Sequence, residues 1–463
     1  MNHRPSGPPK GSRKRGFRFR FSFRVAVLTA VLWFGGPTAT PLRALSGDPD
    51  QLAAEKNQTD IFDEADSIFQ EVSRLRGEPI KEPVAKKFEN QAFFRAYYQR
   101  LLEEQYPPPK KKDIETAYVF FGFLPRGSDL IQNYLDSFMK VVQGLYDPKT
   151  KTLYIADWIQ SGNQEETLAH ELTHALQDQY FGLQAYLDRG SKLSLDEQFA
   201  RAGVMEGEAV AISLNYSLED RNTDFTRLVN IADWVRLSNL LQVEGKRAVG
   251  KKAALNEVIS FPYVYGAAFL QKYVRAYGWP GMAYLFRDPP TSTHQLMHPE
   301  SFFPRRQNPV RVRVEDLSKT VLEGYDGVWD DTMGEYGLLT LLSQYLPEED
   351  ARNAVKGWRG DRVQVYEEKT SHRLLALGYV IFDSESSADQ FFRNYREFLN
   401  TKYAVDSFLR SDDTIHWMSL KNSDAEAYVE RFGRRAVFVE GTPSSLTARV
   451  RGALWNVEQV KKP

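Results

Sequence analysis

The sequence of 463 residues contains no cysteine. This absence excludes disulfide bonds, thiolate metal ligands, a cysteine nucleophile and lipid attachment through cysteine. Histidine is scarce as well, with seven residues in the whole chain. A bound transition metal must therefore be held by histidine, aspartate or glutamate, and only a few ligand combinations are possible.

Apolar runs long enough to span a membrane are also missing. The run at 25–34 falls well short of the roughly 20 apolar residues that a spanning helix needs. It follows a basic segment and precedes small residues and prolines, an order typical of a secretory signal at 1–44. An uncleaved N-terminal anchor is the alternative. We therefore expect an exported protein, periplasmic or extracellular, with membrane attachment only through that segment.

The whole chain lacks an excess of either charge, with 60 basic and 61 acidic side chains. Nine of the basic side chains and none of the acidic ones lie in residues 1–44, so the remainder carries ten more acidic than basic groups. An acidic protein is a poor partner for nucleic acid. The 42% of hydrophobic residues indicates a folded chain and excludes a disordered or collagen-like one.

Hydrophobic periodicity predicts the elements of the first 310 residues. Residues 45–60 are polar and read as a flexible lead-in. Turn residues at 147–150 between two apolar runs predict a hairpin over 144–155. An edge of this hairpin could pair with an extended peptide, and a purely structural hairpin is the alternative. Helical spacing recurs in five segments: 61–105, 163–180, 196–217, 223–243 and 261–277.

The character of the chain changes beyond about residue 325. Helical patterns and strand-like apolar runs alternate there, which predicts a smaller α+β domain at 320–463. The segment 357–362 reads as a turn that joins a helix to a strand. Helices are expected at 332–346, 349–357 and 386–399, and strands at 374–382, 414–419 and 435–440.

The segment that points to chemistry is the motif His-Glu-x-x-His, formed by His170, Glu171 and His174 inside the helix at 163–180. Residues i and i+4 lie on one face of a helix, so the two imidazoles can hold one Zn²⁺. Glu171 would lie beside the ion and could take a proton from a water molecule. A surface helix with two exposed histidines is the alternative. Leucines at helical spacing mark a buried face and argue against it: Leu168, Leu172 and Leu176.

A catalytic zinc usually has three protein ligands, and the third one here should be a carboxylate. Glu206 and Glu208 stand in an otherwise small and apolar helical stretch, where a buried carboxylate is costly unless it meets a charge or a metal. Residues two positions apart are separated by about 200° around a helix, so only one of the two glutamates can face the ion. The face of Glu206 carries Ala202, Ala209 and Val210, which permit close packing. We favour Glu206, with Glu208 as the alternative.

These residues carry a resemblance to the gluzincin group of zinc metallopeptidases. His170-Glu-Leu-Thr-His174-Ala resembles the zinc motif of thermolysin-like enzymes, and Glu206-Gly-Glu-Ala209 is similar to an element of zinc aminopeptidases. The resemblance implies that His170, His174 and Glu206 bind one Zn²⁺ and that Glu171 is the base. The stretch from the hairpin to about residue 304 also resembles uncharacterised exported bacterial metallopeptidases. The expected fold class is α+β: a mostly helical zincin-like metallopeptidase domain at 61–310, followed by the smaller α+β domain.

The chain departs from this pattern in two places. The spacing between His174 and Glu206 is longer than in either named family. Val210 stands where thermolysin-like enzymes place an aspartate four residues after the ligand glutamate. The group that orients a ligand histidine is therefore not assigned by the resemblance. Asp178, one turn beyond His174, could serve, and a surface charge is the alternative.

A hydrolase also needs a donor for the oxyanion that develops on the attacked carbonyl. Gluzincins use a tyrosine or a histidine in this role, so we expect His298 first and Tyr265 second. Tyr263 is better explained by core packing. His294 and His298 are also spaced i, i+4, which would suit a second metal, but the flanking prolines argue against a long helix there.

The sequence therefore predicts an exported zinc-dependent peptidase that acts on a peptide or protein substrate. A non-catalytic binding or assembly protein on a zincin fold is one alternative. A zinc amidase that acts on cell-wall material is another.

Overall fold

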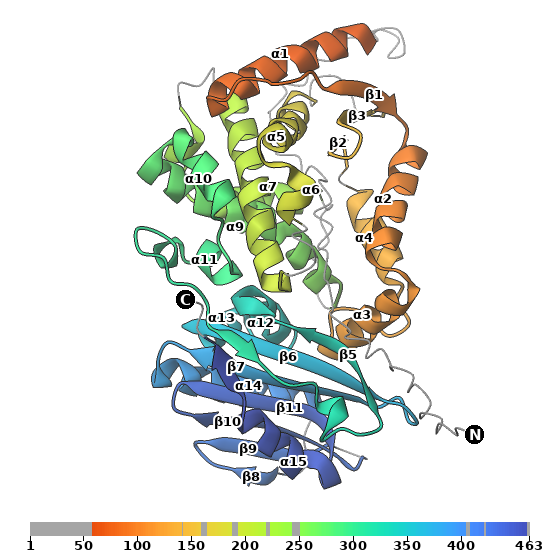
Figure 1. Cartoon of the computed structure of the whole chain (residues 1–463), viewed down its shortest axis with the longest axis vertical. Coiled ribbons are helices and arrows are strands. Elements are labelled where there is room, and N and C mark those ends of the chain that lie inside the picture. Colours follow the sequence, from red (N-terminus) through yellow and green to blue (C-terminus); the bar gives the residue numbers. More distant parts are fainter. Residues whose placement is uncertain are drawn as a thin grey trace, which may run out of the picture.

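The structure is a computed structural model that describes residues 58–140, 142–158, 164–187, 193–218, 223–242, 251–403, 408–420 and 423–460. The expected leader at 1–44, and the lead-in as far as residue 57, lie outside these ranges. The described chain is mixed α/β, with a helical N-terminal part and a β-sheet C-terminal region (Figure 1). Within the described ranges, none of the helices is both long and apolar enough to cross a membrane.

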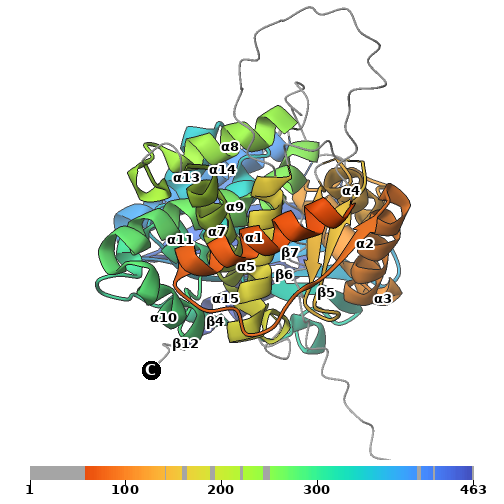
Figure 2. The same ribbon diagram turned by 90° about the horizontal axis from the view of Figure 1, so that it is seen from above.

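The N-terminal part is built from helices around a small sheet. β2 (Gly144–Asp147) and β3 (Thr152–Ala156) form the predicted hairpin, and β1 (Ala85–Glu89) pairs with β3 in parallel, so β2 is an edge of the sheet. The helices are α1 (Gln58–Arg76), α2 (Gln91–Gln105), α3 (Pro108–Phe121), α4 (Leu130–Phe138), α5 (Glu165–Phe181), α6 (Leu183–Leu187), α7 (Leu195–Leu218), α8 (Ile231–Gln242), α9 (Lys251–Tyr277), α10 (Met282–Arg287) and α11 (Thr293–Met297). Viewed from above, α1 lies across α5 and α7 and covers them (Figure 2).

The C-terminal region is an antiparallel sheet of seven strands in the order β5-β6-β7-β11-β10-β9-β8. The strands are β5 (Tyr325–Asp331), β6 (Trp358–Glu368), β7 (Leu374–Phe382), β8 (Phe408–Ser411), β9 (Ile415–Ser419), β10 (Ala425–Phe432) and β11 (Arg435–Pro443). The helices are α12 (Gly334–Leu342), α13 (Glu348–Val355), α14 (Glu385–Tyr403) and α15 (Ser444–Trp455).

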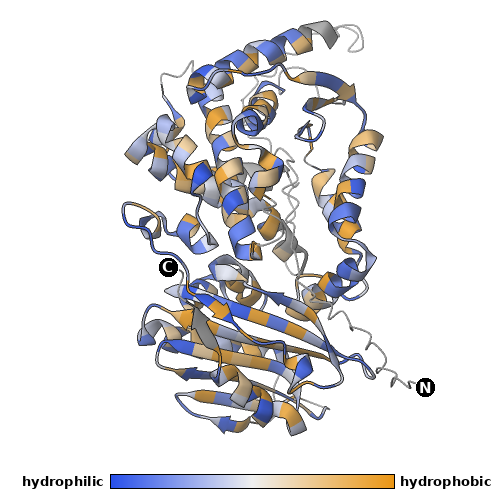
Figure 3. Ribbon diagram, viewed as in Figure 1, coloured by the Kyte–Doolittle hydropathy of each residue, from blue (hydrophilic) through white to orange (hydrophobic). Residues whose placement is uncertain are grey.

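The central strands of this sheet, such as β7 and β11, are buried on both faces. Successive side chains of a strand point to opposite faces, so each strand contributes to two cores. Ala436 and Phe438 share a core with α14, whereas Val437 and Val439 share another with α15. Figure 3 shows the resulting mixture of hydrophobic and hydrophilic residues along the strands. The central strands are thus packed between helices, whereas the edge strand β8 is exposed.

The two regions share one hydrophobic core. Trp329 on β5 packs against Tyr118 and Phe121 on α3, with ring centroids 5.8 and 5.9 Å apart. The connecting strand β4 (Arg311–Arg313) pairs with β12 (Glu458–Val460) near the end of the chain. Near residue 310, where we expected a region boundary, the chain changes from helices to the sheet. The apolar core nevertheless continues from one region into the other.

Four sequence expectations need correction. The helix expected over 223–243 is a 3-10 turn at Phe225–Arg227 followed by α8, which begins at Ile231. The segment 61–105, expected to be helical, contains the strand β1, which separates α1 from α2. The helix expected from 261 begins at Lys251 and contains Pro262 in its interior, because packing against α7 and α8 outweighs the loss of one backbone hydrogen bond. The segment 357–362, expected as a turn, is already the start of β6, with a bulge at Trp358–Gly360.

Candidate metal centre

Three glycines allow α7 and α9 to cross in backbone contact. A Cβ atom on Gly266 of α9 would overlap the carbonyl group of Gly203, and one on Gly207 would overlap the backbone of Gly266. Only glycine permits such an approach. Glu206 precedes Gly207 and Tyr263 lies one turn before Gly266, so this crossing brings both side chains to the same place.

Two histidines and one glutamate meet in a small triangle between α5 and α7. Glu206 Oε2 lies 3.2 Å from His170 Nε2 and 3.3 Å from His174 Nε2, and the two Nε2 atoms are 3.1 Å apart. Ligand atoms that surround Zn²⁺ tetrahedrally at about 2.0–2.1 Å are roughly 3.3 Å from one another. All three side chains are buried. The triangle has the dimensions of one face of a zinc coordination tetrahedron.

Glu208 is not part of this triangle. Its Oε1 accepts a hydrogen bond from Arg76 Nε at 2.8 Å, and its Oε2 accepts one from Gln177 Nε2 at 2.8 Å. Arg76 supplies the opposite charge that a buried carboxylate requires. Of the two glutamates that sequence reasoning left open, the structure brings Glu206 to the histidines and pairs Glu208 with an arginine.

The side chain that orients His174 is Gln177, which the sequence reasoning missed. Its Oε1 lies 2.8 Å from His174 Nδ1, and its amide group also donates to the carbonyl of Met205. Asp178, the residue expected in this position, instead accepts from the Tyr146 hydroxyl and from the amide of Leu183. A glutamine three residues after a histidine has no distinctive sequence signature, so only the packed structure identifies it.

Glu171 faces the β2 strand from the neighbouring position on α5. Its Oε2 accepts a hydrogen bond from the backbone N–H of Tyr146 at 2.6 Å, whereas its buried Oε1 has no hydrogen-bond partner among the described residues. Burial raises the pKa of Glu171 to about 8 in the metal-free protein. For Glu206, burial also acts to raise the pKa, but the two imidazoles outweigh it and lower the pKa. One oxygen of Glu171 is thus held by the protein and the other is available.

Tyr263 is a second residue that sequence reasoning did not assign to the site. Its ring is stacked against that of His170 with centroids 6.2 Å apart, which places this tyrosine beside the triangle. Burial, followed by the charges of Glu206 and Glu171, raises the pKa of Tyr263 well above its usual value. This phenol therefore stays protonated and can donate a hydrogen bond.

The structure does not bring His298 or Tyr265 to this triangle. Tyr265 lies two residues beyond Tyr263, about 200° around the same helix, so it points the other way. Its hydroxyl accepts a hydrogen bond from Arg352 Nη1 at 3.3 Å. His298 belongs to a different group, with His294 and Glu335. The oxyanion role that we expected for His298 or Tyr265 therefore has no geometric support at this site.

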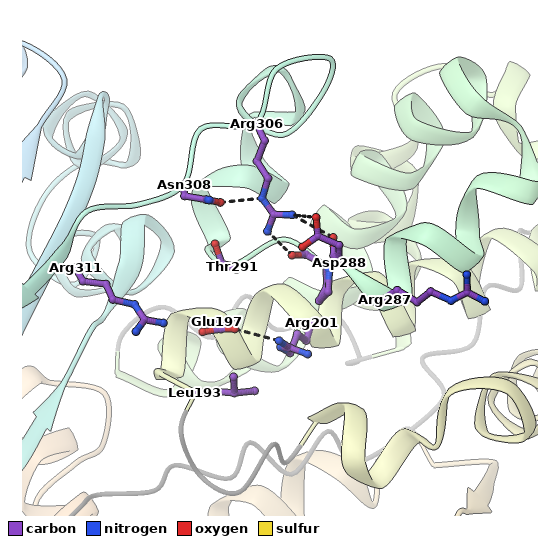
Figure 4. A pocket seen from close by; sticks show the side chains of 10 residues that line it. Leu193, Glu197, Arg201, Arg287, Asp288, Thr291, Arg306, Asn308 and Arg311 are labelled. Carbon is purple, nitrogen blue, oxygen red and sulfur yellow. Dashed lines mark hydrogen bonds and ion pairs between the residues drawn. The ribbon is translucent and has the colours of Figure 1, made fainter. Parts of the chain in front are cut away.

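A polar pocket of about 400 Å³ lies elsewhere, between the start of α7, the end of α10 and β4. Figure 4 shows that Arg306 donates a hydrogen bond to Asn308 and forms an ion pair with Asp288, and that Arg201 donates a hydrogen bond to Glu197. These internal pairs neutralise part of the positive charge. The lining contains none of the six side chains of the two histidine–glutamate groups.

Comparison with known proteins bears on the C-terminal region alone. Residues 320–451 match the family model of a domain of unknown function, DUF8575. The search of curated proteins and the search of solved structures returned no match. The match spans the sheet from β5 to β11 together with α12 to α14 and most of α15, and leaves the helices that carry the triangle outside.

Proposed function

We propose that this protein is an exported zinc-dependent peptidase with a zincin-like, gluzincin-type helical part. The observation that carries the proposal is the triangle of His170, His174 and Glu206, whose ligand atoms are 3.1 to 3.3 Å apart. Further support comes from Glu171, which adjoins the triangle and faces a sheet strand. Export rests on the basic and apolar order of residues 1–44.

The chemistry of these side chains fits a zinc ion. A buried carboxylate and two buried imidazoles form the nitrogen and oxygen donor set that zinc prefers. Three protein ligands leave the fourth position for water or substrate, as in catalytic zinc sites. When bound, zinc would acidify a water molecule and polarise the carbonyl group of a substrate.

The protein residues then have separate tasks. Glu171 takes the proton of the attacking water on its free Oε1 and later delivers it to the leaving amine. The Tyr146 N–H holds the other oxygen of Glu171 in place, so the carboxylate needs no reorientation during this transfer. Tyr263 would keep its proton and donate a hydrogen bond from its hydroxyl to the oxygen that becomes negatively charged when water attacks the carbonyl. Gln177 fixes the ring of His174 through Nδ1.

The test compares Glu171→Gln with His170→Ala in the full chain. Glu171→Gln should keep bound zinc and lose peptide hydrolysis by at least about 100-fold, because it removes the base and leaves the ligands. His170→Ala should lose zinc and activity together. Metal analysis and hydrolysis of a peptide library measure both quantities. A Glu171→Gln protein with unchanged activity would exclude the mechanism, and one whose biological role persists without hydrolysis would favour a binding protein.

A further inference from the structure

A second histidine–glutamate group lies where the helical part meets the C-terminal region. The ligand atoms of His294, His298 and Glu335 all lie within 4.8 Å of one another. Each oxygen of the Glu335 carboxylate contacts one histidine: Oε2 contacts His294 Nδ1, and Oε1 lies 2.9 Å from His298 Nε2. The carboxylate is 3% exposed, so it requires compensation by positive charge.

One helical turn is enough to bring the two histidines together. α11 contains five residues, and Ser292 caps its start by accepting from the amide of Gln295. His298 is the residue at the end of this turn, so both imidazoles lie on one side with ring centroids 4.7 Å apart. The flanking prolines exclude a long helix, as the sequence suggests, but they do not exclude this short one.

The third side chain, that of Glu335, is distant from the histidines in the sequence, and hydrogen bonds fix the start of its helix. Glu335 lies in the first turn of α12, whose leading amides of Met333 and Gly334 both donate to Asp361 at 2.9 Å. On the histidine side, Asp196 of α7 accepts from the amide of Thr293 at 2.8 Å. Both halves of the group are therefore anchored before any ion binds.

The other ring nitrogens also face polar groups. His294 Nε2 lies 3.0 Å from Ser301 Oγ, and His298 Nδ1 lies 3.7 Å from a carboxylate oxygen of Glu300. Metal-binding histidines almost always have a hydrogen-bond partner on the nitrogen that does not bind the ion, because it selects the tautomer and orients the ring. Ser301 is such a partner for His294, whereas the contact of His298 with Glu300 is too long for a hydrogen bond. His298 is 35% exposed, which gives an ion a path from solvent.

We propose that His294, His298 and Glu335 form a second metal site, which takes a divalent first-row transition metal such as Zn²⁺. Two imidazoles and one carboxylate are the ligand types that such ions prefer over Ca²⁺ or Mg²⁺. The histidines belong to the helical part and Glu335 to the region that matches the family model. The bound ion therefore joins the two regions and stabilises their contact.

The test is the zinc content of the full chain and of matched variants, measured after removal of loosely bound metal. The wild-type protein should hold two zinc ions per chain. Glu335→Gln and His298→Asn should each hold one, and His170→Ala should also hold one. His372→Ala is the control: this exposed histidine pairs with Glu367, at 2.9 Å, far from either group of ligands in the sequence, and its removal should leave two ions.

The variants also separate this proposal from the proposed peptidase. A single wild-type ion that is lost in His170→Ala and kept in Glu335→Gln would overturn the second site and leave the first. A single wild-type ion that is lost in Glu335→Gln and kept in His170→Ala would overturn the proposed peptidase centre and leave the second site. If Glu335→Gln fails to fold, thermal unfolding of His298→Asn tests the site instead. Addition of zinc to the metal-free wild-type and His372→Ala proteins should raise the Tm in two saturable steps. Addition of zinc to metal-free His298→Asn should raise its Tm in a single step. Two steps in His298→Asn would overturn the site.

Discussion

At the scale of single residues, neighbours in the sequence take different roles because a helix turns by about 100° per residue. Glu206 meets two histidines whereas Glu208 meets Arg76. Tyr263 meets Glu206 whereas Tyr265 meets Arg352. For the glutamates the sequence narrows the third ligand to Glu206 or Glu208, and the packed helices select Glu206. For the tyrosines the sequence favours Tyr265 over Tyr263, and the structure reverses that preference because Tyr263 lies beside His170.

Replacement of Tyr263 by phenylalanine should lower kcat and leave zinc binding intact. The variant removes the only hydroxyl that we assign to the oxyanion, and loss of one such donor costs about 10²- to 10³-fold in rate. Steady-state hydrolysis and metal analysis measure the two effects. Tyr265→Phe is the matched control and should change kcat less than about threefold. Equal losses in both variants would contradict the assignment.

His416, in the C-terminal sheet, should make stability depend on pH. It is 2% exposed, with Nδ1 2.9 Å from Ser411 Oγ and Nε2 3.1 Å from Asn400 Oδ1. Burial, reinforced by Arg396, lowers its pKa to about 4. The folded protein therefore resists protonation where the unfolded chain accepts it, so stability falls as the pH drops from about 6.5 to about 4.

The variant His416→Gln should lose this part of the pH dependence. The difference in unfolding free energy between pH 7 and pH 4 should shrink by about 1–3 kcal/mol relative to the wild-type protein. Urea unfolding at a series of pH values measures it. The nearby Glu397 and Arg396 remain in both proteins, so the comparison isolates the imidazole. Parallel curves for the two proteins would refute the prediction.

At the scale of elements, the helix crossing of α7 and α9 is the most sensitive feature. Gly266→Ala places a methyl group on the carbonyl of Gly203 and should destabilise the fold by about 3 kcal/mol, since helices cannot separate without disturbing the core. Zinc affinity should fall as well, because Glu206 adjoins the crossing. Denaturant unfolding and zinc titration measure these effects.

The matched control is Gly452→Ala in α15, where a Cβ atom would meet no heavy atom within 4 Å. There the loss of backbone entropy in the unfolded chain should stabilise the protein by about 0.5–1 kcal/mol. If both substitutions changed stability in the same direction, the close crossing would not be the reason.

Sequence reasoning predicted the elements whose periodicity is strong. The helices at 163–180 and 196–217 correspond to α5 and α7, and the strand at 374–382 corresponds to β7. It missed β5, β6, β8 and β10 in the C-terminal sheet, and it placed the start of α9 at its proline. In both places long-range packing outweighs the local preference, which no local pattern reveals.

At the scale of the whole molecule, the continuous core predicts one cooperative unfolding transition. Side chains of α3 and β5, and of α11 and α12, share one apolar cluster across the region boundary. We expect a single peak in calorimetry of the full chain, whose position rises when zinc is added. Two well-separated peaks would mean that the helical part and the sheet fold independently.

The sequence by itself determined the chemistry that is available. The absence of cysteine limited the ligands to nitrogen and oxygen, and the spacing of His170 and His174 placed two of them on one face, because a helix repeats every 3.6 residues. The tertiary structure alone decided which distant groups join them. Glu206, Tyr263 and Gln177 meet at the first group, and Glu335 meets the histidines of the second. These contacts depend on how helices cross, and a crossing is set by long-range packing that leaves no periodic trace in the chain.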